Sequence, residues 1–454
     1  MHLDFLFSVF DENQDKEAII WHDTVVTYKA LLEATRRAMV DLAKLDLRAG
    51  EVVSLESDFT PASVAMFLAL IERGCIVVPL SPVVESKFEE YREIAGVERV
   101  LKPEGPSSWT SSLIPRGAPS SILRQLKATE HPGLILFSSG STGKSKGIVH
   151  DFLPLLEKYK TRKKPLRTIT FLLFDHIGGI NTMLHTLSNG GCLILVSDRA
   201  PDGICRVIES RRAEILPTTP SFINLMLLSE SFRKYDLSSL TLVTYGTETM
   251  SQATLDNFHR TFPKIHLLQT YGLSEVGILR SKSKSSDSLW VKLGGDGFDI
   301  RIREGLLEIK AASSMLGYLN AESPFTEDGW FKTGDAVEVD GEYIHILGRK
   351  SDLINVGGQK VYPIEVENVL QLIPGVEEVV VSGELNALLG HIVKARVKTS
   401  APEDLQAFRI RMREFCKDKL PPYKIPQKVE FMKTTAVTGR FKKTRSPDMT
   451  QEAI

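Results

Sequence analysis

The chain has 454 residues, 42% of them hydrophobic and 25% charged, and its 56 basic and 57 acidic side chains nearly cancel. This composition is typical of a globular protein and excludes a disordered chain. The balanced charge gives no indication of binding to nucleic acid or to an anionic membrane.

Targeting and redox features are scarce. No apolar run approaches the roughly 20 residues that span a bilayer, so we expect no membrane span. The first residues have acidic flanks and no basic leader, so we expect no signal peptide. The four cysteines are scattered without metal-ligand spacing and are expected to be reduced thiols. Together these features predict a cytoplasmic protein.

Short apolar runs alternate with helix-like segments through the first 270 residues. The runs predict strands at 75–80, 133–137, 192–196, 240–246 and 265–272. The intervening segments predict helices at 61–74, 202–213, 221–232 and 251–262. This alternation is typical of an α/β fold with mainly parallel sheets flanked by helices, in which ligands lie beyond the carboxyl ends of strands.

The pattern changes after this region. Residues 281–288 have no apolar side chain and are expected to form a solvated loop, followed by hairpin-like strands to about residue 348. The pattern then restarts with a helix at 363–373, strands at 376–383 and 391–398, and a helix at 402–420. About 100 residues suffice for a small α+β domain. We therefore predict two domains, residues 1–349 and residues 350–454.

A glycine-rich loop, SSGSTGKSKG, occupies residues 138–147. It resembles a Walker A loop, but Ser138 stands where the first glycine belongs. The residues after Ser145, KGIVH, contain a glycine and β-branched side chains where a Walker loop must open a helix. A phosphate-binding loop of another kind is therefore favoured.

Four further motifs follow this loop in the order typical of the adenylate-forming superfamily, which includes acyl- and aryl-CoA synthetases, peptide-synthetase adenylation domains and luciferases. They are YGLSE (271–275), GWFKTGD (329–335), GRKSDLINVGGQKVYPIEVE (348–367) and TGRFKK (438–443). The chain resembles this superfamily from about residue 130 to its end. The resemblance implies a large N-terminal AMP-binding domain and a small mobile C-terminal domain, hinged near Ser351.

The resemblance also implies a set of ATP-binding residues. The loop would hold the β and γ phosphates, with Thr142 and Lys144 taking part in catalysis. The loop residues implied are Ser138, Ser139, Gly140, Ser141, Thr142, Gly143, Lys144, Lys146 and Gly147. Adenine would meet Tyr271, Gly272 and a strand end formed by Gly246, Thr247 and Glu248. Ser274 would contact a phosphate, Glu275 would bind Mg²⁺, and Asp335 and Arg349 would hold the ribose.

Two places leave alternatives open. The glycine pair Gly357 and Gly358 would admit a pantetheine arm, or it would form a plain β-turn. Arg440 stands where the family places its catalytic lysine, and arginine is not a neutral exchange for lysine. Either Arg440 substitutes for that lysine, Lys442 or Lys443 reaches in, or adenylation is slow or lost.

The acid pocket is expected along residues 172–184, where His176 and Gly178 resemble the acyl- and aryl-acid ligases. An alignment shifted by one residue makes Asp175 the partner of an α-amino group, as in peptide-synthetase domains. Both side chains also have a structural explanation, as a histidine bonded to backbone and a helix-capping aspartate. We prefer the alignment on His176 and Gly178.

The predicted function is that of an ATP-dependent, AMP-forming acid:thiol ligase that acts through an acyl-adenylate and releases pyrophosphate. ATP and Mg²⁺ are the implied cofactors, and the acceptor is coenzyme A or the phosphopantetheine of an acyl carrier protein. One alternative is a stand-alone amino-acid adenylation domain, and another is a catalytically weakened ATP-binding homologue. A basic run at 158–167 is either a solvated face or a docking surface for the acceptor.

Overall fold

The computed structural model describes residues 2–105, 108–115, 117, 119–139, 145–295 and 297–432, together with 436, 438, 441, 443 and 445; the side chain of Ser139 is not described. Within these ranges every helix is too short or too polar to cross a lipid bilayer. The four cysteines are buried and form no disulfide with one another.

The first sheet has the order β20-β8-β7-β4-β3-β5-β6. Its inner strands β7, β4, β3 and β5 run parallel, whereas β8, β20 and β6 pair antiparallel. Its strands are β3 (Val52–Glu56), β4 (Ile76–Leu80), β5 (Arg99–Pro103), β6 (Trp109–Leu113), β7 (Gly133–Ser139), β8 (Ser145–Asp151) and β20 (Gly317–Tyr318).

The second sheet has the order β13-β12-β11-β9-β10-β1-β2 and is parallel except at its β1–β2 edge. Its strands are β1 (Glu17–Trp21), β2 (Thr24–Thr27), β9 (Arg167–Thr170), β10 (Cys192–Leu195), β11 (Ile215–Thr218), β12 (Leu242–Tyr245) and β13 (His266–Gln269). The prediction of mainly parallel sheets is confirmed, because both sheets are built from short apolar strands joined by helical crossovers.

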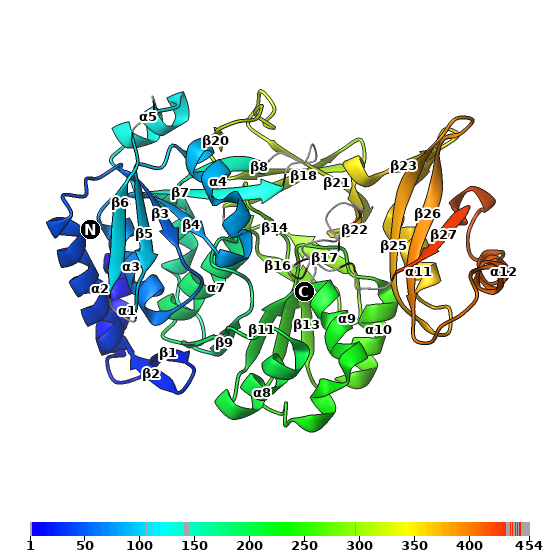
Figure 1. Cartoon of the computed structure of the whole chain (residues 1–454), viewed down its shortest axis with the longest axis horizontal. Coiled ribbons are helices and arrows are strands. Elements are labelled where there is room, and N and C mark those ends of the chain that lie inside the picture. The colour runs from blue at the N-terminus through cyan, green and yellow to red at the C-terminus, as the bar shows by residue number, and fades with distance from the viewer. Residues whose placement is uncertain are drawn as a thin grey trace.

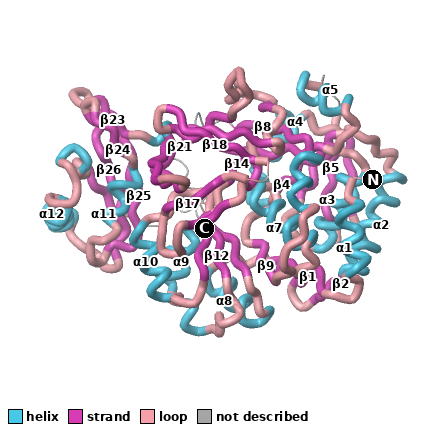
Figure 2. Tube along the Cα trace, turned by 180° about the vertical axis from the view of Figure 1, so that it is seen from behind, coloured by secondary structure: helices cyan, strands magenta, loops and turns pink. Residues whose placement is uncertain are grey.

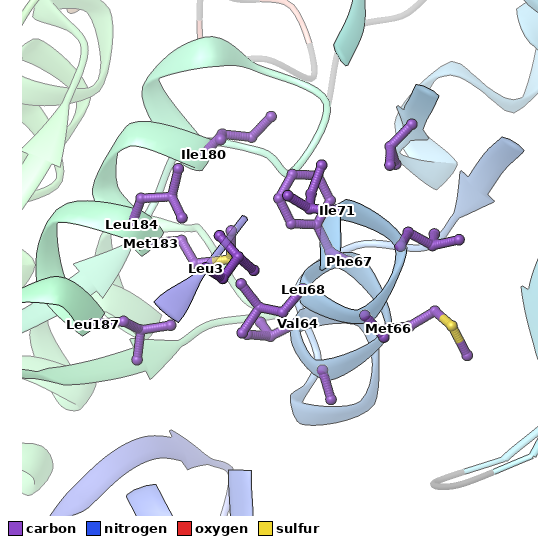
Figure 3. Close-up of a cluster of buried hydrophobic side chains, with 14 of the residues drawn as sticks. Leu3, Val64, Met66, Phe67, Leu68, Ile71, Ile180, Met183, Leu184 and Leu187 are labelled. Atoms are coloured by element: carbon purple, nitrogen blue, oxygen red, sulfur yellow. The ribbon is translucent and has the colours of Figure 1, made fainter. Parts of the chain in front are cut away.

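A single hydrophobic core joins the two sheets, with helices packed between them. These helices are α1 (Asp4–Glu12), α2 (Tyr28–Lys44), α3 (Pro61–Glu72), α6 (Phe152–Leu156) and α7 (Ile177–Ser188). Figure 3 shows the apolar face of α7 against that of α3, with Leu3 between them. The α7 side chains in this contact are Ile180, Met183, Leu184 and Leu187, which recur at helical spacing.

Other helices cover the outer faces of the two sheets. On the first sheet these are α4 (Phe88–Ala95) and α5 (Ser121–Ala128). On the second sheet they are α8 (Pro201–Arg211), α9 (Pro220–Ser229) and α10 (Gln252–Thr261). Short 3₁₀ turns join several elements: η1 (Pro82–Lys87), η2 (Glu157–Tyr159), η3 (Ser231–Lys234), η4 (Lys350–Asp352) and η5 (Pro422–Lys424). The four helices predicted in this part of the chain are all present.

A third sheet is antiparallel, as the turn-rich sequence after residue 288 predicts. Its strands are β16 (Ser281–Ser283), β17 (Trp290–Leu293), β18 (Phe298–Arg303), β19 (Leu306–Ala311), β21 (Phe331–Asp340) and β22 (Tyr343–Arg349). A short antiparallel pair, β14 (Gly272–Leu273) and β15 (Gly277–Ile278), leads into it.

The prediction that 281–288 is a plain solvated loop is wrong in part, because β16 lies within it. The hydroxyls of Ser281, Ser283 and Ser286 accept the backbone N–H groups of Tyr271, Gln269 and Leu267 at 2.9–3.2 Å. Serine hydroxyls thus serve as acceptors for the edge of the second sheet, which a search for apolar residues does not detect.

The C-terminal part forms a separate sheet with its own hydrophobic core at one end of the molecule (Figure 1). Its elements are β23 (Ile354–Val356), β24 (Gln359–Val361), α11 (Pro363–Leu370), β25 (Val376–Asn386), β26 (Gly390–Thr399), α12 (Leu405–Cys416) and β27 (Lys428–Phe431). Figure 2 shows α11 and α12 beside these strands from behind. The large N-terminal and small C-terminal architecture is confirmed; the boundary at residue 350 stays a prediction.

Candidate active site

A cavity of about 1140 Å³ lies where the predicted motifs meet. Ligand pockets usually measure about 300–1000 Å³, so this cavity lies just above the upper end of that range. The predicted site residues that line it are Ser138, His176, Gly178, Gly246, Thr247, Gly272, Ser274, Glu275 and Arg349. A smaller cavity of about 260 Å³ shares Thr247, Gly272 and Arg349 with it and is also lined by Glu248, Tyr271 and Asp335.

The phosphate loop connects β7 to β8. Gly140, Ser141, Thr142, Gly143 and Lys144 lie outside the described residues. The element after Ser145 is strand β8 rather than a helix, which confirms that this is not a Walker A loop. The start of β8 is held by Asn320, whose amide donates to the Ser145 carbonyl at 2.8 Å and accepts from the Gly147 N–H at 3.0 Å.

His150, near the end of β8, is a residue that the sequence analysis missed. It is fully buried, and its Nε2 lies 2.6 Å from the carbonyl of Ser274. Burial lowers its pKa to about 4, so the ring is neutral at pH 7 and donates from Nε2 to that carbonyl. His150 thereby ties the strand that leaves the phosphate loop to the YGLSE segment.

The end of β12 is shaped by an unusual backbone. A Cβ on Gly246 would lie 2.7 Å from the carbonyl of Thr270, so a side chain does not fit there. Thr247 follows with a φ of +70°, which costs a β-branched residue about 1–3 kcal/mol. Strain of this kind persists where the surroundings hold it and is concentrated at functional sites. The carboxylate of Glu248 turns away to Ser221 at the start of α9, accepting from its hydroxyl at 2.7 Å.

Tyr271, Asp335 and Arg349 form a connected polar group. The Tyr271 hydroxyl donates to Asp335 at 2.5 Å, and the Arg349 Nε lies 3.5 Å from the other carboxylate oxygen. Asp335 is 6% exposed, and burial raises its pKa, an effect that the Arg349 guanidinium opposes. The register of the third sheet pairs Asp335 directly with Arg349 across β21 and β22, which explains why two distant motifs meet here.

Glu275 lines the same cavity and accepts from the Tyr318 hydroxyl at 2.8 Å. The Lys146 ammonium lies 5.1 Å from the centre of the Tyr318 ring. A carboxylate facing a cavity, with a neutral hydroxyl as its bonded partner, suits a hard divalent cation on phosphate oxygens. The donor set therefore fits the predicted Mg²⁺.

The C-terminal segment returns to this cavity. Arg440 lies outside the described residues, but its neighbour Phe441 is 8% exposed and packs on Phe171 and Phe222, with ring centres 5.0 and 5.7 Å away. The Phe441 carbonyl accepts from the Thr219 hydroxyl at 2.6 Å. The backbone N–H of Lys443 donates to Glu248.

Thr438 and Lys443, which lie on either side of position 440 in the sequence, both line the cavity. The Lys443 ammonium is bonded to the C-terminal part. It donates to Glu367 at 3.1 Å and to the Val379 carbonyl at 3.0 Å, both in the C-terminal part.

The start of α7 forms the predicted acid wall. His176 caps this helix by accepting the Gly178 N–H on Nδ1 at 3.0 Å. A Cβ on Gly179 would lie 2.0 Å from the Leu173 carbonyl, so tight packing accounts for the second glycine. Asp175 is 5% exposed and is not among the described residues that line the cavity.

The glycine pair at 357 and 358 forms the two-residue turn between β23 and β24. Both residues have a left-handed φ, +57° and +88°, which the turn requires. This turn accounts for both glycines without a ligand. Their contact with a pantetheine arm stays a prediction.

Comparisons with known proteins agree with this architecture. The AMP-binding enzyme family model matches residues 89–294, and the model of the AMP-binding enzyme C-terminal domain matches residues 365–446. The indoleacetate–CoA ligase of Aromatoleum aromaticum is 27% identical over 83% of this chain and 78% of its own length. The 2-succinylbenzoate–CoA ligase of Bacillus cytotoxicus is 26% identical over 92% of each chain.

The fold is also that of solved structures. The crystal structure of an anthranilate CoA ligase in complex with anthranoyl-AMP superposes with a TM-score of 0.81 at 18% identity, covering 97% of this chain and 95% of that one.

Proposed function

The chain belongs to the AMP-binding enzyme family, and from that premise we propose that it is an AMP-forming acid:thiol ligase. The carboxylate of an organic acid attacks the α-phosphorus of ATP, the bond to the β-phosphate breaks, and pyrophosphate leaves. A thiol then takes the acyl group from the acyl-adenylate and releases AMP. The observation that carries this function is the large cavity, which joins the α7 acid wall to residues 272–275 and Arg349.

The polar group at 271, 335 and 349 is well placed to hold the nucleoside. An ionised Asp335 has one oxygen for Tyr271 and accepts a ribose hydroxyl with its remaining lone pairs. The Arg349 guanidinium opposes the rise in the pKa of Asp335 and so favours its ionised form. Arg349 also lines the cavity, where it would meet a ribose or phosphate oxygen. The end of β12 would supply the backbone surface for adenine.

The phosphates would lie between the loop at 138–147 and the YGLSE segment. Lys146 and Ser274 would contact phosphate oxygens there, with the loop residues Ser139 to Lys144 expected to complete the cradle. Mg²⁺, when bound at Glu275, would neutralise charge that develops on the leaving pyrophosphate. Arg440 would bridge the acid and the α-phosphate from the segment that Phe441 anchors.

We take coenzyme A as the acceptor, since the relatives named above are CoA ligases. Delivery to the phosphopantetheine of a carrier protein is the second option, with Gly357 and Gly358 along the arm in either case. A cytoplasmic location remains a prediction from composition.

Two alternatives differ from this proposal at named residues. An amino-acid adenylation domain would need Asp175 at the pocket, and its place away from the cavity lining favours the acyl-acid alignment on His176. The second alternative is a catalytically weakened ATP-binding homologue, in which Arg440 in place of the family's catalytic lysine would explain the loss of activity.

Acid-dependent exchange of pyrophosphate into ATP, measured over aryl, fatty, dicarboxylic and amino acids, tests the function. We expect exchange with one of the organic-acid classes and CoA-dependent thioester formation with the same acid. ATP binding without exchange for any acid would contradict the ligase function, and exchange confined to amino acids would contradict the acyl-acid assignment. A large gain from Arg440→Lys would show that the native residue slows adenylation.

A further inference from the structure

Lys158 stands in η2 and lines the large cavity. Its ammonium donates to the Asn181 side-chain oxygen at 2.7 Å and to the Ile278 carbonyl at 3.2 Å. Both acceptors are neutral, and the ammonium also lies 5.0 Å from the centre of the Tyr159 ring. Two of its three N–H donors are thus bonded, and among the described residues no carboxylate pairs with it. Removing an ammonium from water without an opposing charge is costly. Lys158 is therefore an amine whose charged form an anionic ligand would stabilise.

The surroundings of Lys158 add positive charge. Lys163 and His185 line the same cavity, and the Lys163 ammonium lowers the pKa of both Lys158 and His185, in addition to the larger effect of burial. Within the described ranges, the ion pairs of this basic run join Lys160 to Glu157, Arg162 to Glu12 and Arg167 to Glu17, at the surface of the protein. The run is thus divided: two lysines face the cavity and other members face solvent.

Two hydroxyls provide an independent observation. Thr186 on α7 is 3% exposed and Thr218 at the end of β11 is 2% exposed, and both line the cavity. Neither hydroxyl oxygen has a hydrogen-bond partner among the described residues. A buried hydroxyl normally has one, so a polar ligand group is expected to supply it.

Helix α7 explains how this polar wall forms. Its core face carries the side chains shown in Figure 3, and the opposite face turns Asn181, His185 and Thr186 to the cavity. Ile278, which holds Lys158 from β15, pairs directly with Gly272, next to the nucleotide residue Tyr271. The polar wall therefore lies within the same cavity as the reacting carboxylate, on the α7 side of the nucleotide segment.

We propose that the acid substrate carries a second anionic group, a carboxylate, which binds Lys158 with Lys163, His185 and the Thr186 hydroxyl around it. This inference rests on the proposed ligase function and narrows it to dicarboxylic acids. The second carboxylate forms a charge-assisted hydrogen bond to the free N–H of Lys158. It takes no part in the chemistry, and so Lys158 determines specificity.

Pyrophosphate exchange with matched acids tests the proposal. Each pair differs by a carboxylate in place of a methyl group: hexanedioic with hexanoic acid, octanedioic with octanoic acid, and terephthalic with para-toluic acid. For at least one pair we expect kcat/KM to favour the diacid, and we expect Lys158→Met to lower the diacid-to-monoacid ratio by about 10- to 100-fold. Lys160→Met, an exposed neighbour in the same run, should leave the ratio unchanged.

A smaller fraction of folded enzyme does not by itself lower the diacid-to-monoacid ratio, because both acids are measured on the same preparation. Thr186→Val preserves the shape of the side chain and removes one hydroxyl, so it should lower the diacid-to-monoacid ratio by about 3- to 10-fold. This variant replaces Lys158→Met as the test if Lys158→Met does not fold. Exchange with monoacids and a ratio that neither variant alters would overturn the second-anion site while leaving the ligase function intact. Absence of exchange with every acid would instead overturn the ligase function itself.

Discussion

The nucleotide side and the acid side of the proposed site differ in how their buried charges are paired. At Asp335 the carboxylate is bonded to Tyr271 and paired with Arg349, so the charged groups compensate one another before any ligand binds. At Lys158 the ammonium has neutral partners, and its charged neighbour Lys163 repels it. The first arrangement is complete in the free protein, whereas the second has no anion among the residues that the structure describes.

This difference corresponds to two requirements: binding ATP, which the family shares, and selecting an acid, which differs between its members. Every member of the family must hold ATP, and a preorganised group of compensated charges does this without depending on the acid. The acid differs between members, and a charge left without its counterion selects for a substrate that supplies one. The two sides should therefore respond differently to substitution.

The largest effect is expected at Asp335. Asp335→Ala removes the proposed ribose acceptor and takes a bonded partner from the buried Tyr271 hydroxyl and from Arg349, so kcat/KM for ATP should fall by about 100- to 1000-fold. All acids should be affected equally, because this side does not contact them. The exchange assay at varied ATP measures the loss. Asp340→Ala, on the exposed end of the same strand, removes a surface pair with Lys284 and should have almost no effect.

If the loss of kcat/KM in Asp335→Ala depended on which acid is used, the two sides would not act independently, because the nucleotide side would then contribute to acid selection.

An intermediate effect is expected at Phe441, which belongs to neither side and directly follows the proposed catalytic residue Arg440 in the sequence. Phe441→Ala removes an aromatic anchor from the Phe171–Phe222 pocket, and burial of such a side chain is worth about 1.5–3 kcal/mol. The rate of adenylate formation should fall by about 10- to 100-fold, while the ATP dissociation constant changes little. Single-turnover formation of acyl-AMP and equilibrium ATP binding measure the two quantities.

Phe441→Leu, which still fills the pocket, should retain most of the rate. Equal rates for Phe441→Ala and the wild type would show that the C-terminal segment does not need this anchor, and the proposed place of Arg440 would then lose its support.

The same contrast explains what the sequence could and could not predict. Motifs revealed Tyr271, Asp335 and Arg349 because each lies in a short segment with a recognisable pattern, and the structure then brought the three together. Lys158 lies in a basic run that looks like a solvated face, and its contacts with Asn181 and Ile278 cross 23 and 120 residues of chain. His150 escaped notice for the same reason, since its partner Ser274 is 124 residues away. Periodicity reports burial along one element, not which distant side chains share a cavity.

The smallest effect, about tenfold, is expected from pH, and it distinguishes the two sides without a substitution. Burial and then Lys163 lower the pKa of Lys158 to about 7 in the free enzyme, and a bound carboxylate would raise it. Binding of a diacid therefore takes up a proton. Its affinity is full below pH 7 and falls as the pH rises above 7, so KM for the diacid should increase by about tenfold between pH 6 and pH 8.

The other groups that face Lys158 do not produce this dependence. Burial, with Lys163 and Lys158, lowers the pKa of His185 to about 4, so that ring stays neutral between pH 6 and pH 8. Asn181 from α7 and the Ile278 carbonyl from β15 do not titrate, and burial raises the pKa of Tyr159 far above this range. The matched monoacid should show no such rise in KM, and Lys158→Met should make the diacid profile flat. A diacid KM that is constant from pH 6 to pH 8 in the wild type would mean that its second carboxylate does not meet a titrating ammonium.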